Sequence, residues 1–226
     1  DSNDNPHIAY YATRKTIDSG EGLKYAHWDG SAWIVTMIDE DGAIRPGKYA
    51  SIALDSLDYP HIFYGAGQFS NTAFWYTHWN GTEWLKSKIS YYIGTGGEYF
   101  SVAMDNNDNV HVSFTDGFEI QGYSYSRLHY LTNKGGSFVE QDISDARGGT
   151  SINIDSNGNP AIAYNYYQQE TLTPIINPAY VKWDGSMWIY SNISDEGSTE
   201  NLALALDANN GPHISYTNNS GEIKYA

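Results

Sequence analysis

The sequence predicts an all-β fold, from its composition and from an internal repeat. Its 226 residues include 20 Tyr, 7 Trp and 7 Phe, and aromatic side chains favour the pleated, half-buried surface of a sheet. A heptapeptide, NPHIAYY at residue 5, recurs as YPHIFYG, NVHVSFT, NPAIAYN and GPHISYT at residues 59, 109, 159 and 211. The intervals of 54, 50, 50 and 52 residues define a repeat of roughly 50 residues.

Each repeat contains four segments with strand character, which we call a, b, c and d. Segment a is typified by ASIALD at residue 50, b is the heptapeptide, c is typified by LKYAHW at residue 23, and d by WIVTMID at residue 33. Asn, Asp and Gly join a to b and c to d, as expected for tight hairpins. Four antiparallel strands in each repeat make one blade of a β-propeller.

The expected architecture is a single β-propeller domain over residues 1–226, with about five four-stranded blades. The chain starts in an a–b turn and stops after a segment c, so the terminal blades are incomplete. Incomplete blades leave unpaired strand edges. We therefore expect flanking sequence or another copy of the chain to complete the ring, or the chain to belong to a longer array.

Charge and composition exclude several classes of partner. The formal net charge is −15 and the sequence pI is about 4.6, so the chain repels the phosphates of nucleic acids. The sequence contains no apolar run long enough for membrane insertion. With no Cys, disulfides and thiol chemistry are also excluded.

The repeat resembles the NPHI.YYD…LKYA.WDG..W units of secreted bacterial and archaeal propellers. It is distantly similar to the BNR or Asp-box repeats of sialidase-like propellers, although the Asp-box separates Asp from Gly by one residue. Here the Asp29-Gly30 and Asp184-Gly185 pairs are adjacent. The resemblance implies an extracellular, secreted or cell-surface protein, from a class that includes lectin-like modules, polysaccharide lyases and hydrolases.

The two ends of the predicted strands differ. The a–b and c–d turns are short and nearly identical between repeats, whereas the other connections are predicted as long, irregular loops, which is where binding residues concentrate. The predicted b–c loops are 12–22, 65–73, 115–127 and 165–178, and the d–a loops are 39–49, 90–99, 144–149 and 194–200.

This loop face carries the candidate ligand-binding residues. Aromatic rings stack on sugars, and Arg binds carboxylate or sulfate through two parallel hydrogen bonds. The same side chains would also suit the packing and solubility of long loops. The candidates are Arg14, Arg45, Phe69, Tyr91, Tyr92, Phe118, Tyr123, Tyr125, Arg127, Arg147, Tyr166 and Tyr167.

Three functions follow from these observations. The favoured one is a non-catalytic extracellular recognition module, lectin-like or adhesive, that binds carbohydrate or an extracellular protein. The alternatives are a polysaccharide-active lyase or glycoside hydrolase, and a structural propeller that self-associates through its incomplete blades. Whether the chain is an enzyme stays open, and no catalytic residue is predicted. A lyase would need Tyr or His as base and Arg to neutralise a uronate.

The histidines and the a–b turns are predicted to be structural. The segment b histidine occurs in four of five copies, with Ala161 in the remaining one, so we expect it to bond a turn Asp or a carbonyl. The a–b turns, such as DSNDN, space oxygens as some calcium loops do, but an Asx turn explains them more simply. No metal ligand or cofactor is predicted, and a structural Ca²⁺ stays an open alternative.

Overall fold

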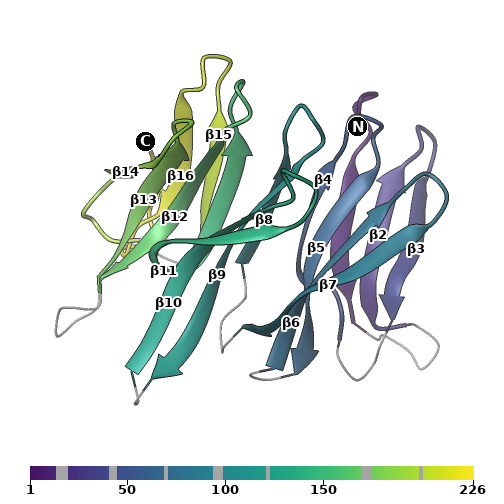
Figure 1. Cartoon of the computed structure of the whole chain (residues 1–226), viewed down its shortest axis with the longest axis horizontal. Coiled ribbons are helices and arrows are strands. Elements are labelled where there is room, and N and C mark those ends of the chain that lie inside the picture. The colour runs from purple at the N-terminus through teal and green to yellow at the C-terminus, as the bar shows by residue number, and fades with distance from the viewer. Residues whose placement is uncertain are drawn as a thin grey trace. The chain divides into compact units, whose positions relative to one another are not determined.

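The computed structural model describes residues 1–13, 20–40, 45–68, 71–93, 99–120, 123–168, 175–198 and 201–226. Every regular element among them is a β-strand, as predicted (Figure 1). None of the described residues form a helix with the length and apolar character needed to cross a bilayer. The chain divides into two compact units, residues 1–95 and 96–226, and each is described here by itself.

The first unit contains two antiparallel sheets. One has the order β1–β2–β3, and the other has the order β4–β5–β6–β7. Leu23 and Tyr25 from β2 form a buried cluster with Ile62 and Tyr64 from β5. These strands are β1 (His7–Ala12), β2 (Gly22–Trp28), β3 (Trp33–Glu40), β4 (Lys48–Leu54), β5 (Pro60–Gln68), β6 (Asn71–Trp79) and β7 (Trp84–Ile93).

The second unit contains a seven-stranded sheet, with the order β14–β13–β12–β11–β10–β9–β8, and a three-stranded sheet, with the order β15–β16–β17. Its main core gathers Leu128, Ile152, Ile162 and Val181 from four neighbouring strands. The strands are β8 (Tyr99–Met104), β9 (Val110–Ile120), β10 (Tyr123–Thr132), β11 (Val139–Ile154), β12 (Pro160–Gln168), β13 (Ile175–Trp183), β14 (Trp188–Asn192), β15 (Leu202–Leu206), β16 (Pro212–Thr217) and β17 (Ile223–Tyr225).

Strand β11 corrects the prediction of a d–a loop at 144–149. Its first half pairs with β10 as segment d of one repeat, and its second half pairs with β12 as segment a of the next. The change of partner occurs at a register shift between Ala146 and Thr150, where Gly148 has φ +87°. Pairing on both sides of this shift satisfies backbone groups that a loop would leave to solvent.

The predicted b–c loops are also shorter than expected. Strands β5 and β6 pair as far as Gln68 and Asn71, and β9 and β10 as far as Ile120 and Tyr123. In the fourth repeat, pairing extends to Gln168 and Ile175. Residues that were predicted to lie in loops instead extend the paired strands of these hairpins. Aromatic and β-branched residues favour this pleated surface.

The a–b turns confirm the Asx-turn prediction. The Asp105 carboxylate accepts hydrogen bonds from the backbone N–H groups of Asn107 and Asn109, at 2.9 Å each. The same pair of bonds recurs at Asp1, Asp55, Asp155 and Asp207.

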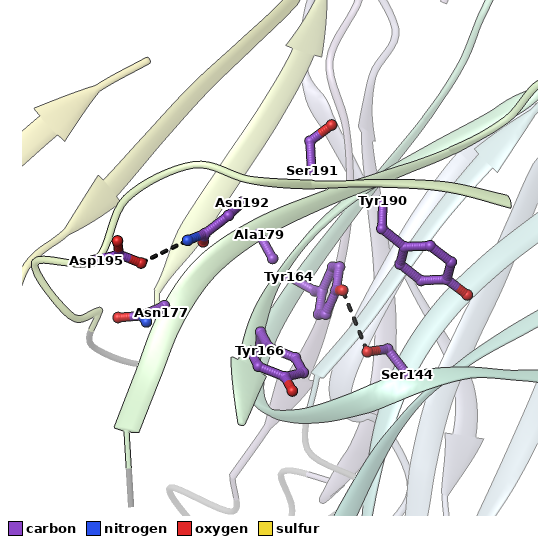
Figure 2. Close-up of a pocket in the computed structure, with 9 residues that line it drawn as sticks. All are labelled: Ser144, Tyr164, Tyr166, Asn177, Ala179, Tyr190, Ser191, Asn192 and Asp195. Carbon is purple, nitrogen blue, oxygen red and sulfur yellow. Dashed lines mark hydrogen bonds between the residues drawn. The ribbon is translucent and has the colours of Figure 1, made fainter. Parts of the chain in front are cut away.

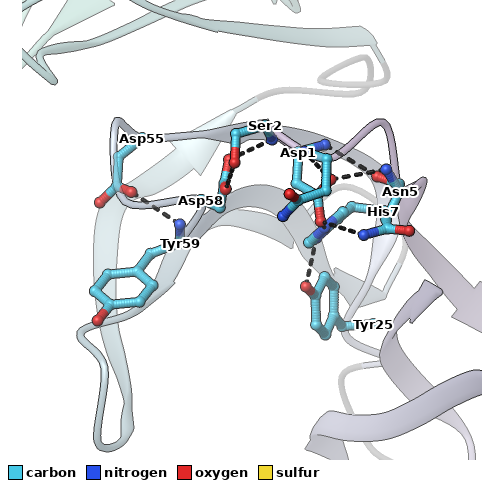
Figure 3. Close-up of polar contacts among 9 residues, drawn as sticks. Asp1, Ser2, Asn5, His7, Tyr25, Asp55, Asp58 and Tyr59 are labelled. Carbon is cyan, nitrogen blue, oxygen red and sulfur yellow. Dashed lines mark hydrogen bonds and ion pairs between the residues drawn. The ribbon is translucent and has the colours of Figure 1, made fainter. Parts of the chain in front are cut away.

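Neighbouring a–b turns also bond each other. In the first unit, the backbone N–H and hydroxyl of Ser2 both donate to the Asp58 carboxylate (Figure 3). In the second unit, the Ser156 N–H donates to Asn210 Oδ1 at 2.9 Å, and the amide of Asn210 donates back to Ser156 Oγ at 2.8 Å. These bonds join consecutive repeats at their short-turn ends.

Candidate functional site

Two adjoining cavities lie in the second unit, at the strand ends opposite the short turns. They have volumes of about 450 and 500 Å³ and share Ser144, Tyr166 and Tyr190. We call the two together the tyrosine site. The first cavity is also lined by Tyr164, Asn177, Ala179, Ser191, Asn192 and Asp195 (Figure 2), and the second by Arg127, Asp142, Ile143 and Asp145.

The alternation of strand β12 places its tyrosines on different faces. Tyr164 and Tyr166, two residues apart, both line the first cavity. Tyr164 is only 3% exposed and forms its floor, with its hydroxyl donating to Ser144 Oγ at 3.3 Å (Figure 2). Burial raises the pKa of Tyr164, so this hydroxyl stays protonated.

The rim of the site carries two accessible aromatic rings. Tyr166 is 37% exposed and Tyr190, from β14, is 53% exposed. The hydroxyl of Tyr190 donates to the Ile143 carbonyl at 2.9 Å, which fixes the ring while leaving much of it in solvent. Two oriented rings beside a cavity can stack on a planar or ring-shaped ligand.

The polar side of the first cavity comes from β13, β14 and the segment that follows β14. Figure 2 shows Asn177 near Asn192 and Asp195, and the Asn192 amide donates to Asp195 Oδ1 at 2.6 Å. The side-chain oxygen of Asn177 is buried and accepts no hydrogen bond from the described residues. An unsatisfied buried acceptor is costly, so a donor from a ligand or water would stabilise this wall.

The second cavity carries the charges of the site. Arg127 Nη1 lies 2.8 Å from Asp142 Oδ2. The other oxygen of Asp142 lies 2.9 Å from Nδ1 of His129, a buried imidazole on β10. Burial alone would lower the pKa of His129, but the carboxylates of Asp116 and Glu140 outweigh it and raise the pKa to about 9.

The structure brings two of the predicted residues, Arg127 and Tyr166, into this site. Tyr167 is on the other face of β12, is 7% exposed, and lies 5.7 Å below the guanidinium of Arg147. Tyr167 and Arg147 are therefore separated from Tyr166. Arg45 belongs to the first unit, where its Nε lies 3.6 Å from Glu21.

The remaining predicted residues, or their side chains, lie outside the described part of the chain. Arg14 and Phe69 lie outside the described residues. Five others lie in strands, but their side chains are also outside the described part of the chain. They are Tyr91 and Tyr92 in β7, Phe118 in β9, and Tyr123 and Tyr125 in β10.

Sequence reasoning missed Tyr164, Tyr190 and Asn192, which belong to strands rather than to predicted loops. Asn177 and Asp195 fall inside the predicted loops 165–178 and 194–200, but the ligand-binding candidates were limited to Arg and aromatic residues. Extending those candidates to amides and carboxylates would have added both.

Comparisons with known proteins support the propeller. No family model and no curated protein sequence matches the chain. Aleuria aurantia lectin in complex with alpha-methyl-L-fucoside has a TM-score of 0.57 at 10% identity, over 98% of this chain and 72% of the lectin. A second structure of a fungal lectin, described as a six-bladed β-propeller with a novel fucose recognition mode, has a TM-score of 0.57 at 11% identity, over 97% and 72%.

A polysaccharide lyase, PL25-Ulvanlyase, has a TM-score of 0.54 at 15% identity, over 94% of this chain and 60% of the lyase. The chain thus spans less than two thirds of that enzyme. Identities this low show fold rather than activity. The chain is an all-β protein similar in fold to β-propellers.

Proposed function

We propose that the chain is a non-catalytic carbohydrate-binding module whose ligand occupies the tyrosine site. The observation that carries this proposal is the combination of two exposed rings, Tyr166 and Tyr190, with the unsatisfied buried oxygen of Asn177 in one cavity. A sugar offers both an apolar ring face and hydroxyl donors. Pockets that combine a few placed polar groups with aromatic walls are typical small-ligand sites.

Each part of the site has a role toward a sugar. The rings of Tyr166 and Tyr190 would stack on the C–H face of a pyranose. The oxygen of Asn177 would accept a hydroxyl proton, and Asp195 would accept another. Arg127, in the adjoining cavity, would extend the site toward a carboxylate or sulfate on a longer acidic glycan.

Two of the similar structures are of Aleuria aurantia lectin, one in complex with alpha-methyl-L-fucoside and one described with a novel fucose recognition mode. This likeness supports a lectin-like role and an extracellular location for the present chain. We also propose that each repeat forms one blade, with about five blades in the chain, whereas the fungal lectin is described as six-bladed.

Polysaccharide cleavage is the second candidate function. Arg127, Tyr166 and Tyr190 line the same cavity, and a lyase pairs a Tyr base with a cation that neutralises the uronate. The similar structure of a polysaccharide lyase gives this alternative further support. Binding is favoured because the hydroxyl of Tyr190, a candidate base, already donates to the Ile143 carbonyl.

An array of neutral and acidic glycans, scored for both retention and chain cleavage, distinguishes the two functions. The proposal expects retention without cleavage, lost by Tyr190→Ala and preserved by Tyr10→Ala, which changes a half-buried tyrosine of β1 in the first unit. Cleavage abolished by Arg127→Ala would favour the lyase. The absence of retention across neutral and acidic glycans would contradict carbohydrate binding.

A further inference from the structure

A second cluster of chemically active side chains lies between strands β10 and β11. Nδ1 of His129 is 3.0 Å from Glu140 Oε1 and 2.9 Å from Asp142 Oδ1. One ligand atom from each of the three residues lies within 4.8 Å of the others. The sheet dictates this placement, since His129 pairs with Asp142 across a register shift, and Glu140 is two residues away on the same face of β11.

The surroundings of the His129 imidazole indicate a bound ligand. The His129 side chain is only 8% exposed, and its nitrogens meet carboxylate oxygens at short distances. None of these contacts has the alignment of a hydrogen bond, so both nitrogens are buried without a hydrogen-bond partner in the described part of the chain. Because the carboxylates raise the pKa of His129, Nδ1 carries a proton when no metal is present, and a divalent cation that displaced this proton would bind the Nδ1 lone pair between the two carboxylates.

We infer that His129, Glu140 and Asp142 form a binding site for a divalent transition-metal ion, with Asp116 as a positioning residue. One imidazole and two carboxylates suit Zn²⁺ or Mn²⁺ better than Ca²⁺, which prefers oxygen ligands alone. With metal–ligand bonds of about 2.0–2.1 Å, neighbouring ligand atoms lie about 3 Å apart, close to the separations observed here.

Further contacts hold the proposed metal ligands in place. Asp116 Oδ1 lies 3.0 Å from Nε2 of His129, where it can hold the ring with Nδ1 directed at the carboxylates. Arg127 retains Asp142 Oδ2 and leaves Oδ1 for the metal. When a metal has displaced the imidazole proton, the carboxylates of Asp116, Glu140 and Asp142 and the guanidinium of Arg127 leave a net charge that matches a divalent ion. Glu140 and Asp142 are exposed, so water can fill the remaining coordination positions.

The metal site shares Asp142 with the second cavity of the tyrosine site, but the inference does not rest on carbohydrate binding, and its test is metal binding itself. Calorimetric titration at pH 8 with Zn²⁺, Mn²⁺ and Ca²⁺ in turn should show one Zn²⁺ or Mn²⁺ per chain. Glu140→Gln and Asp142→Asn should each weaken the affinity at least tenfold, and Asp116→Asn about 10–100-fold. Glu83→Gln, at an exposed acid in the turn between β6 and β7, is the control and should bind as the wild type.

His129→Gln should abolish binding of the transition metals. Because this variant removes a buried side chain, the exposed Glu140→Gln variant serves as the independent test if His129→Gln does not fold. The inference is overturned if neither Zn²⁺ nor Mn²⁺ binds, which would leave the cluster as a network of ion pairs. It is equally overturned if Glu140→Gln retains wild-type affinity, or if only Ca²⁺ binds.

Discussion

Nδ1 of His111 lies 2.6 Å from the hydroxyl of Tyr130 on the adjacent strand, and its Nε2 lies 3.4 Å from Asp105 in the preceding turn. A neutral imidazole with its proton on Nε2 can donate toward Asp105 and accept from Tyr130. The same His–Tyr contact occurs at His7–Tyr25 (Figure 3), His61–Tyr76 and His213–Tyr225. The repeated histidine is thus part of the fold, as predicted from its recurrence.

The His111–Tyr130 pair predicts a loss of stability in acid. Burial lowers the pKa of His111 below 6.5, and Asp105 opposes this only in part. The unfolded chain therefore binds a proton more readily than the folded one, so the stabilisation is complete above pH 6.5 and lost as the pH falls below it. Urea denaturation between pH 8 and pH 5 should show this slope.

The variant His111→Gln should flatten that slope. The matched control is His213→Gln, because the His213–Tyr225 pair has the same partners but is exposed. A slope that is unchanged in His111→Gln, or equally reduced in both variants, would contradict the assignment to the buried imidazole.

The repeat without histidine provides a test of the Tyr hydroxyl. Tyr130→Phe leaves Nδ1 of His111 buried without its partner and should cost about 1–3 kcal/mol in the free energy of unfolding. Tyr180 is the corresponding tyrosine of the repeat that has Ala161, and both residues are buried. Tyr180→Phe should therefore cost much less, and an equal loss in the two variants would rule out the explanation.

Each turn aspartate should stabilise the fold through one of its two carboxylate oxygens. Asp155 Oδ1 accepts the N–H groups of Asn157 and Asn159, at 2.9 and 2.8 Å. Asp155→Ala removes both bonds and should reduce the free energy of unfolding by about 1–2 kcal/mol. Asp155→Asn keeps an acceptor and should recover most of that loss in thermal denaturation, whereas equal losses would show that the charge matters instead.

The register shift in β11 predicts a position where only glycine fits well. Gly148 is buried with φ +87°, and its carbonyl accepts the Thr115 hydroxyl at 2.9 Å. A side chain in this left-handed conformation costs about 1–2 kcal/mol. Gly148→Ala should lower the denaturation midpoint accordingly, while Val139→Ala, at an exposed position of the same strand, should lower it less. Equal midpoints for Gly148→Ala and the wild type would contradict the strain.

The sequence predicted the repeating elements well because their causes are local. An Asp followed by small polar residues makes its own turn, and the strand-forming segments b and c are fixed by alternation. The limits of the hairpins were less predictable, since backbone pairing carries β12 through Gln168 into residues taken as loop. For the same reason, the sequence did not predict that Tyr166 is exposed and Tyr167 is buried. Alternation along strand β12 places their rings on opposite faces.

The sequence predicted which face of the fold carries the candidate site, but not most of the residues that form it. Arg127 and Tyr166 were selected by residue type, whereas Tyr190 enters through the pairing of β13 with β14. The His129 cluster depends on the register shift that places Asp142, rather than its neighbour Ile143, opposite the imidazole. Spacing in the sequence does not specify such a shift.

The most direct test of the proposed function is the affinity of the best-retained glycan, measured by titration calorimetry for the wild type, Tyr166→Ala and Tyr10→Ala. The tyrosine site predicts that Tyr166→Ala weakens binding tenfold or more and that Tyr10→Ala does not. Binding that is equally strong in all three proteins would contradict the assignment of the ligand to this site.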